Sequence, residues 1–317
     1  MRAELWQLVL LAGLLCGFAP VVAVSDAVAA TDATARAGAV APEVVPGDAA
    51  RIAAQCRAAS RRECRQRSLR AKCAWSSALE SCERMPRVFF IGNSFTQGGT
   101  SLPSVLAQLA KSGKRKMRVA RQTKNGALLY QHVQRGGVER ARGFIKNPGD
   151  FVVLQEQSQV FSLPKSQWMS YSLDAVQSFQ DMCASESAQC LLFLTWGYLN
   201  GDFYHYPAGQ DSYDAMQDRL GSGYNGVAQM TGAIVCPAGE VWREVYHYLK
   251  EHGGEARQLY RSDNKHNSAL GHYVVACAMY ACIFDASPVG LGFRPGGVSP
   301  ELAATIQQFA ANVVLGN

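Results

Sequence analysis

One serine and one aspartate–histidine pair stand in surroundings that suit nucleophilic chemistry. Ser94 follows the apolar run 88–91, a position that predicts a loop between a strand and a helix. Near the other end of the chain, Asp263 and His266 are three residues apart, just before a helical segment. A serine hydroxyl becomes an effective nucleophile when a histidine takes its proton and a carboxylate orients that histidine. The three side chains together predict a Ser-His-Asp hydrolase.

Each part of this pattern has a plainer interpretation when taken alone. Ser94 in a turn is also typical of a helix cap, because serine side chains bond to the free N–H groups of a first helical turn. Asp263 and His266 are also typical of a cap followed by a surface histidine. The hypothesis therefore depends on the elements that bring the two segments together.

Those elements alternate regularly along the chain. Apolar runs predict strands at 88–91, 151–154, 191–194 and 233–235, and the segment 117–122, with Val119 and Ala120 at its centre, is expected to form another. Helical periodicity appears between and after them, at 102–109, 127–133, 165–185, 213–229, 241–249, 268–284 and 301–313. This alternation predicts a three-layer α/β/α sandwich with a mostly parallel sheet of about five strands. Ligands bind at the carboxyl ends of such strands, where Ser94 is expected.

Four segments resemble, in order, the sequence blocks of the SGNH-hydrolase superfamily, the GDSL-like esterases and lipases. They are 92–96 (Gly-Asn-Ser-Phe-Thr), 125–129 (Asn-Gly-Ala-Leu-Leu), 152–158 (Val-Val-Leu-Gln-Glu-Gln-Ser) and 263–266 (Asp-Asn-Lys-His). The resemblance covers roughly residues 87–315. It implies a flavodoxin-like fold and a carboxylic ester hydrolase that needs no metal and no organic cofactor.

The resemblance also implies a role for each block. Ser94 attacks an acyl carbonyl, His266 accepts its proton, and Asp263 orients His266. The N–H groups of Ser94 and Gly126 and one side-chain amide hold the resulting oxyanion.

The chain departs from the family pattern at two points. The family supplies the oxyanion amide from Asn, whereas this chain offers Gln157, preceded by Gln155. Glutamine carries the same donor on a longer arm, and which of the two faces the site stays open. The family often has Pro after the final His, but here the residue is Asn267, which affects the loop more than the chemistry.

The segment after the fourth strand is rich in aromatic residues. Flat rings beside amide and carboxylate groups suit stacking on the C–H face of a sugar. We therefore predict substrate contacts from Trp196 and Tyr198, together with Asn93 and Gln155 near the nucleophile. The alternative is that Trp196 packs beneath the loop and the tyrosines are ordinary surface residues.

The N-terminal third of the chain differs in composition. Residues 1–24 have a basic start, an apolar centre and a small-residue exit, which predicts a signal peptide or an uncleaved signal anchor. Residues 25–50 predict a flexible linker, and residues 87–317 the hydrolase domain. We expect a secreted or secretory-lumen protein that meets a membrane only through an uncleaved anchor at 5–24.

Residues 51–86 predict a small basic module stapled by disulfides. Cys56, Cys64, Cys73 and Cys82 fall close together, which in an oxidising compartment indicates two bridges of undetermined pairing. Zinc is disfavoured because Cys-x2-Cys spacing is absent. With one aromatic residue in the module, nucleic acid is not an expected partner. Further along, Cys183 and Cys190 are candidates for another pair.

The leading hypothesis is a serine esterase that removes a small acyl group, most simply acetyl, from a carbohydrate. A lipase or thioesterase would use the same triad with a longer apolar groove, to which Phe95 and Phe161 are candidate contributors. A protein that keeps the fold as a scaffold for non-catalytic binding is the alternative from another class.

Overall fold

The computed structural model describes residues 56, 58–64, 73–76, 81–98, 101–207 and 209–316. The predicted targeting segment at 1–24 and the linker at 25–50 lie outside them. Among the helices in these ranges, none combines the length and hydropathy needed to cross a bilayer.

A five-stranded sheet forms the centre of the molecule. Its strands are β3 (Arg87–Gly92), β4 (Arg118–Thr123), β5 (Phe151–Leu154), β6 (Gln189–Phe193) and β7 (Ile234–Cys236). Their order is β4-β3-β5-β6-β7, and every neighbouring pair is parallel. All four residues of β5 are buried, as expected for a strand covered on both faces. The parallel five-stranded prediction is confirmed, with the strand order of the flavodoxin type.

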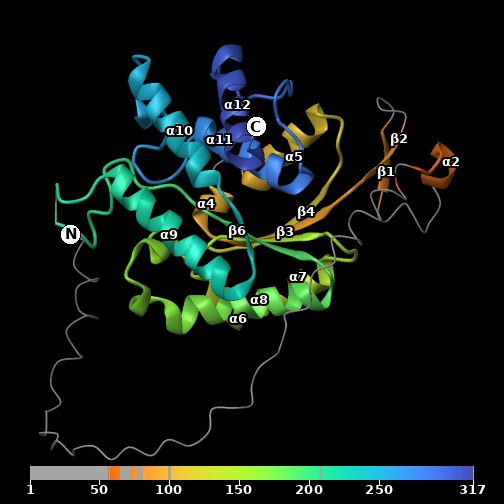
Figure 1. The fold of residues 1–317 in the computed structure, drawn as a ribbon, viewed down its shortest axis with the longest axis horizontal. Coiled ribbons are helices and arrows are strands. Elements are labelled where there is room, and N and C mark those ends of the chain that lie inside the picture. Colours follow the sequence, from red (N-terminus) through yellow and green to blue (C-terminus); the bar gives the residue numbers. More distant parts are fainter. Residues whose placement is uncertain are drawn as a thin grey trace, which may run out of the picture. The chain divides into compact units, whose positions relative to one another are not determined.

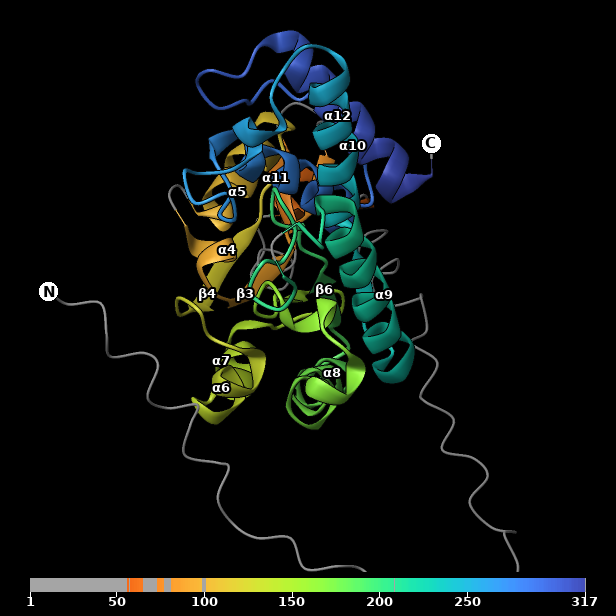
Figure 2. The same cartoon turned by 90° about the vertical axis from the view of Figure 1, so that its left-hand side faces the viewer.

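Helices cover both faces of this sheet (Figures 1 and 2). One face carries α6 (Leu129–Gln134), α7 (Gly137–Phe144) and α8 (Asp174–Ser185), with α9 (Tyr213–Thr231) beside α8. The other carries α5 (Leu102–Ser112), α10 (Ala238–Glu251), α11 (Ala269–Phe284) and α12 (Pro300–Leu315). Helix α11 is buried almost all round, between α5, α10 and α12. The predicted three-layer sandwich is therefore confirmed.

Two helical predictions need correction. The segment 165–185 is not one helix but a 3-10 turn (Lys165–Gln167), a π-helical turn (Met169–Leu173) and then α8. The break buries the Trp168 ring against Phe161, and the indole N–H donates to the carbonyl of Leu163. Tertiary packing thus overrides helical periodicity. Helix α7 was missed because it begins at a Gly136-Gly137 pair, a signal more typical of a turn.

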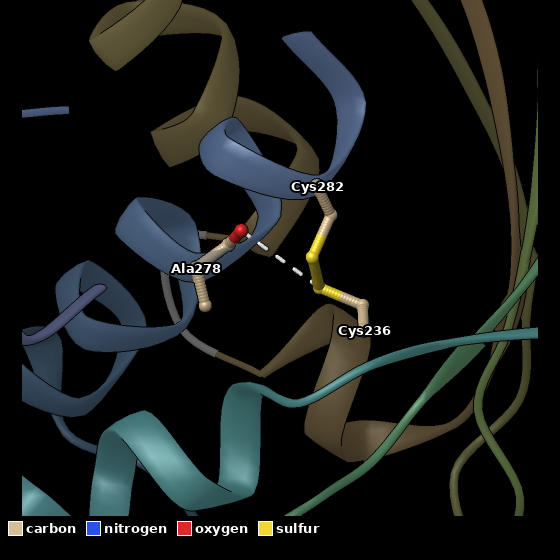
Figure 3. Close-up of a disulfide and its surroundings, with 3 residues drawn as sticks. All are labelled: Cys236, Ala278 and Cys282. Carbon is tan, nitrogen blue, oxygen red and sulfur yellow. Dashed lines mark hydrogen bonds between the residues drawn. A yellow bond between two sulfur atoms is a disulfide. The ribbon is translucent and has the colours of Figure 1, made fainter. Parts of the chain in front are cut away.

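The main domain contains a disulfide whose partners could not be assigned from the sequence. Cys236 at the end of β7 and Cys282 in α11 form a disulfide, which ties the edge of the sheet to the buried helix (Figure 3). Cys183 and Cys190 are both buried and remain unbridged, so the suggested pair does not form.

The N-terminal module contains helix α2 (Arg61–Cys64) and an antiparallel hairpin of β1 (Cys73–Ser76) and β2 (Ser81–Arg84). Cys56 and Cys73 form a disulfide, and Cys64 is also disulfide-bonded. Cys56, Cys64 and Cys73 are buried together and make up most of the small core. Disulfides thus take the place of an extensive apolar core, as predicted for this segment.

Candidate active site

The segments predicted to carry chemistry meet in one pocket of about 360 Å³. The loop after β3 supplies the nucleophile segment, the loop after β4 supplies Gly126, and the loop after β5 supplies Gln157. The loop before α11 supplies His266. The pocket is lined by Asn93, Ser94, Phe95, Asn125, Gly126, Gln157, Ser158, Gln159, Tyr198, Tyr204, Lys265 and His266.

Ser94, His266 and Asp263 form a continuous chain of hydrogen bonds. The Ser94 Oγ atom lies 2.8 Å from Nε2 of His266, and Nδ1 of His266 lies 2.5 Å from Oδ2 of Asp263. The Phe95 ring meets the imidazole edge-on at 5.3 Å between centroids. This geometry leaves Nε2 to accept the serine proton while the carboxylate holds the other ring nitrogen.

Asp263 is held by the turn on which it lies. Its Oδ1 atom accepts hydrogen bonds from the backbone N–H groups of Lys265 and His266, both at 3.0 Å. Asn264 has a φ of 60°, the left-handed conformation that asparagine tolerates and that lets the chain turn back. Burial raises the pKa of Asp263, but hydrogen bonds from His266 and Lys265 outweigh it and lower the pKa to about 2. The residue is therefore a carboxylate at neutral pH.

The loop that carries Ser94 is fixed by two buried amides. Asn93 caps α4 (Ser94–Gln97) by accepting from the Phe95 N–H at 3.1 Å. Gln155 accepts from the Asn93 N–H at 2.9 Å through Oε1 and donates to Asn93 Oδ1 at 3.0 Å through Nε2. A Cβ atom at Gly92 would lie 2.6 Å from Gln155 Oε1, so this close approach requires glycine.

The structure distinguishes the two glutamines that the sequence left open. Gln155 is fully buried and hydrogen-bonds to Asn93 in the nucleophile loop, whereas Gln157 lines the pocket. The predicted substrate contact from Gln155 is therefore wrong in its placement, because the side chain does not reach the pocket. Asn93 does line it, but the amide is already committed to the cap and to the carbonyl of Ala127.

Three donors converge on the pocket. The backbone N–H groups of Ser94 and Gly126 have no acceptor among the described residues. Gly126 has a φ of 67°, which favours glycine. Gln157 Oε1 accepts from the Gln159 N–H at 2.9 Å, which fixes the orientation of the amide. Its Nε2 atom is 3.3 Å from Gln159 Oε1, and the second hydrogen on Nε2 is left for a ligand.

A buried carboxylate that sequence reasoning missed joins two of these loops. Glu156 is fully buried and accepts from the N–H groups of Leu129 at 3.0 Å and Gln157 at 2.7 Å. The Ser172 hydroxyl donates to its other oxygen at 2.6 Å. Burial raises the pKa of Glu156. Its position within the third block was visible in the sequence, but the contacts with Leu129 and Ser172 were not.

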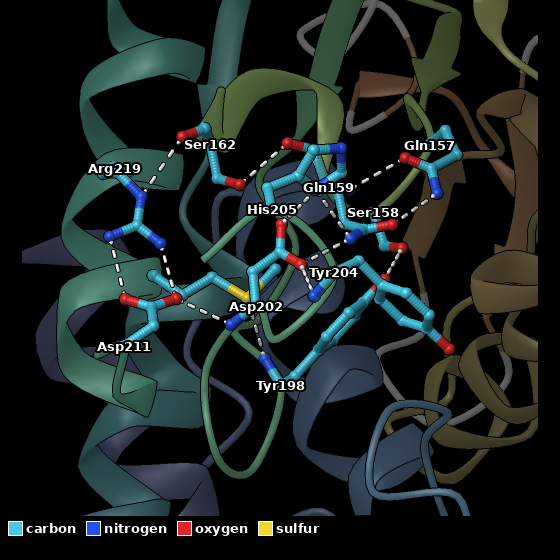
Figure 4. Close-up of polar contacts among 11 residues, drawn as sticks. Gln157, Ser158, Gln159, Ser162, Tyr198, Asp202, Tyr204, His205, Asp211 and Arg219 are labelled. Atoms are coloured by element: carbon cyan, nitrogen blue, oxygen red, sulfur yellow. Dashed lines mark hydrogen bonds and ion pairs between the residues drawn. The ribbon is translucent and has the colours of Figure 1, made fainter. Parts of the chain in front are cut away.

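A second aspartate–histidine pair lies beside the site (Figure 4). Asp202 is fully buried, and its Oδ2 atom lies 2.8 Å from Nδ1 of His205. Its Oδ1 atom accepts from Gln159 Nε2 at 2.7 Å. Because a carboxylate only accepts, Gln159 must turn its Nε2 toward Asp202 and its Oε1 toward Gln157. Asp202 thus helps to orient the amide at the pocket. Its Asp-x-x-His spacing from His205 was visible in the sequence.

The aromatic segment divides into a buried part and a pocket-lining part. Trp196 is fully buried, stacked between Phe95 and Trp242 at centroid distances of 4.4 and 4.3 Å. Its indole N–H donates to the Lys265 carbonyl at 2.9 Å. The predicted sugar contact from Trp196 is therefore wrong, because its ring packs between Phe95 and Trp242 and does not line the pocket. The alternative weighed from the sequence is the one observed.

Tyr198 lines the pocket, as predicted, and its hydroxyl lies 2.7 Å from the Ser158 hydroxyl. Tyr204 also lines it, with 60% of its surface exposed. The Lys265 ammonium donates to the Tyr204 hydroxyl and lies 5.6 Å from the centre of the Tyr198 ring. The pocket therefore offers two rings and one cation beside the triad. Lys265 was not singled out because a lysine in a loop is usually a solvated surface residue.

No group of three or more potential metal-ligating side chains occurs within the described ranges. The polar side chains that line the pocket carry hydroxyl, amide, imidazole and ammonium groups.

Comparisons with known proteins give matches at the level of structure. No protein-family profile matches the chain, and no curated protein sequence matches it. A protein of the DUF4886 family from Bacteroides uniformis superposes with a TM-score of 0.60 and 17% identity, covering 73% of this chain and 95% of its own.

Two other solved structures are similar over the main domain. A protein described as a putative SGNH hydrolase from Slackia heliotrinireducens matches with a TM-score of 0.46 and 23% identity, covering 62% of this chain and 98% of its own. An acetylxylan esterase from Geobacillus stearothermophilus matches with a TM-score of 0.46 and 16% identity, covering 62% and 94%. At these identities the likeness concerns the fold, and the chemistry has to be argued from the residues themselves.

Proposed function

We propose that the protein is a serine esterase that hydrolyses a small acyl ester, an acetyl ester in the simplest case, carried by a carbohydrate. One observation carries the proposal: the unbroken chain from Asp263 through His266 to Ser94 at 2.5 and 2.8 Å. A cap and a surface histidine have no reason to meet a serine that lies 172 residues away.

In the first half-reaction, Ser94 Oγ bonds to the acyl carbon while His266 Nε2 takes its proton. The carbonyl electrons move to the oxygen, which the N–H groups of Ser94 and Gly126 and the Gln157 amide stabilise. Asp263 stabilises the imidazolium. His266 then returns the proton to the leaving alcohol oxygen as the ester C–O bond breaks, and an acyl-serine remains.

In the second half-reaction, water attacks the acyl-serine and His266 takes its proton. The same donors hold the second oxyanion. The bond to Ser94 Oγ then breaks, the carboxylic acid leaves, and the proton returns to the serine. The cycle consumes one ester and one water and needs no redox partner.

A small acyl group fits the shape of the site. The pocket of about 360 Å³ lies at the lower end for ligand sites. Phe95 lines it, but Phe161 lines a different pocket, next to Trp168 and Arg219. The two phenylalanines considered for a long apolar groove therefore do not share one. This separation favours an esterase for short acyl groups over a lipase.

A carbohydrate alcohol is supported by the rest of the lining. The ring of Tyr204, which is 60% exposed, offers flat apolar surface, and the side chains of Asn125, Gln157 and Ser158 add hydrogen-bonding groups to the same pocket. Aromatic rings next to amides and hydroxyls are the combination that binds the two kinds of surface on a sugar.

The test is hydrolysis of p-nitrophenyl acetate, butyrate and octanoate by the protein and its Ser94→Ala variant, followed by acetate release from acetylated polysaccharides. We expect acetate to be the best acyl group and the variant to fall to background while its melting temperature stays within a few degrees. If both proteins are equally inert on every ester while folded, the esterase proposal fails and a non-catalytic binding scaffold takes its place. A preference for octanoate would replace it with a lipase.

We also propose that the protein acts in a secretory compartment or outside the cell. Support comes from the disulfides Cys56–Cys73 and Cys236–Cys282, because such bonds persist in oxidising compartments. Expression of the full chain followed by sequencing of the mature N-terminus tests the proposal. A start near residue 25 in secreted material supports a cleaved signal, and retention of residues 1–24 in a membrane fraction supports an anchor. An intact chain in the cytosol with reduced cysteines contradicts it.

A further inference from the structure

A second pocket flanks the catalytic loop and shares no lining residue with the pocket at Ser94. Its volume is about 480 Å³. Arg261 and Ser268, at either end of the loop that carries Asp263 and His266, both contribute to it. The remaining walls come from α5, the first turns of α11 and the segment between α11 and α12. They are Val105, Gln108, Ala269, His272, Phe293, Arg294, Pro295 and Gly296.

This lining is strongly positive. It contains two arginines and no carboxylate. Neither guanidinium forms an ion pair within 4.0 Å in the described part of the chain, although the exposed Glu301 acts on Arg294 from a longer distance. Arg261 Nε donates to the Asn267 carbonyl at 3.1 Å, and its terminal nitrogens have no protein acceptor among the described residues. Arginine presents a planar fork of donors that matches carboxylate and phosphate groups.

A buried imidazole in the same wall lacks a partner. His272 is 2% exposed, and its Nε2 atom has no hydrogen-bond partner among the described residues. Burial, aided by the charge of Arg261, lowers the pKa of His272 to about 4, so the ring is neutral at pH 7. A buried polar atom without a partner is costly. His272 belongs to the lining of the pocket, so a ligand bound there is a candidate for the missing partner.

The N-terminus of helix α11 adds to the positive electrostatic potential of this pocket. The helix is 16 residues long and begins at the pocket, with Ser268 as its cap. The Ser268 hydroxyl accepts from the Gly271 N–H at 3.2 Å, so it covers only part of the first turn. The exposed N–H groups and the dipole of a helix N-terminus favour negative charge.

We propose that this pocket binds an organic anion about the size of one sugar, whose carboxylate or phosphate group is held by Arg261 and Arg294 and whose body contacts His272 and Phe293. The unpartnered imidazole nitrogen distinguishes the site from a mere basic surface patch. The volume suits a ligand larger than a free inorganic ion. The proposal is independent of ester hydrolysis, because it uses none of the residues that line the first pocket.

The ligand would also touch the catalytic loop. The Arg261 backbone N–H donates to the His266 carbonyl at 2.7 Å, and its guanidinium lies against Gly98, just after the helix that carries Ser94. An anion on Arg261 therefore acts on a side chain that connects the two catalytic segments.

Binding is measured by calorimetry on the folded protein with glucuronate, glucose 6-phosphate and inorganic phosphate, with glucose as the neutral control at matched ionic strength. We expect saturable binding of at least one sugar anion below about 10 mM, none of glucose, and weaker binding of inorganic phosphate. Preference for glucuronate identifies a carboxylate ligand, and preference for glucose 6-phosphate a phosphate ligand.

Three variants complete the test. Arg294→Gln and His272→Phe are expected to weaken binding about tenfold or more, whereas Arg257→Gln, an exposed arginine outside the pocket, leaves it unchanged. Melting curves show whether each variant is folded. If no sugar anion binds, or if Arg294→Gln and His272→Phe both bind like the parent, the proposal is wrong. Equal weakening by Arg257→Gln would reduce it to general charge attraction and would also overturn it.

Discussion

The chain contains two Asp-x-x-His turns, and they serve different purposes. In each, the histidine Nδ1 atom bonds to the aspartate three residues earlier, at 2.5 Å for His266 and 2.8 Å for His205. His266 presents its other nitrogen to Ser94. The second carboxylate, Asp202, instead accepts from the Gln159 amide and is fully buried.

An Asp-x-x-His spacing therefore predicts a local hydrogen bond between the two side chains, but it does not predict what the histidine contacts with its other nitrogen. Only one pair contacts Ser94, because the fold brings the loops after β3 and before α11 to the same edge of the sheet. The other pair acts through Gln159 on the orientation of the Gln157 amide. We propose that one pair moves a proton and that the other holds an oxyanion donor in place.

The largest expected effect is a difference in the loss of activity between variants of the two histidines. His266→Ala removes the base, and kcat on p-nitrophenyl acetate is expected to fall about 10⁴-fold or more. His205→Ala leaves Asp202 with its bond from Gln159 and is expected to cost less than about fivefold. Comparable losses in both variants would contradict the assignment of roles.

The next effect concerns the amide that the second pair orients. Gln157→Ala removes one of three oxyanion donors, and we expect kcat to fall about 10²-fold with little change in KM. Gln157→Asn is the matched control, because it keeps the donor on a shorter arm. An increase in KM alone would place Gln157 in substrate binding.

A smaller effect is expected from the carboxylate behind that amide. Asp202→Asn can present an N–H where Gln159 needs an acceptor, so the Gln159 and Gln157 amides lose their fixed orientation. We expect a fall in kcat of about tenfold at unchanged KM, not additive with Gln157→Ala. Full additivity with Gln157→Ala would show that Asp202 acts on the loop in general.

The smallest expected effect is a pH dependence of the stability that Asp263 contributes. The folded pKa of Asp263, about 2, lies below the unfolded value of about 3.9, so its stabilising contribution is complete above about pH 4 and is lost as the pH falls toward 2. The melting temperature of the parent should exceed that of Asp263→Asn at pH 5 to 7, and the gap should close between pH 4 and 2. A gap independent of pH would mean that Asp263 is not ionised in the folded protein.

The fold was largely predictable because the central strands β3, β5 and β6 contain uninterrupted apolar runs. Phe151–Leu154 is buried on both faces and bounded by a clear turn, so its length and place in the sheet follow from local signals. The break in the segment 165–185 was not predictable in this way. It results from burial of Trp168 against Phe161, a contact that exists only in the folded chain.

The site shows the same division. The roles expected of Ser94, Asp263 and His266 came from the resemblance of four ordered sequence blocks, and the structure brings the three side chains within hydrogen-bond distance. The choice between Gln155 and Gln157 depended on which side of the loop faces the pocket, and Trp196 depended on the rings of Phe95 and Trp242 above and below it. Sequence spacing carries no information on such contacts between distant segments.

Covalent labelling of Ser94 tests the central claim most directly. The folded protein is treated at pH 7.5 with a fluorophosphonate, which reacts with serines that a histidine activates, and the modified peptide is identified by mass spectrometry. The account predicts one labelled residue, Ser94, in the parent and in His205→Ala, and no labelling in His266→Ala. Unlabelled parent protein, or labelling of Ser94 that persists in folded His266→Ala, would contradict it.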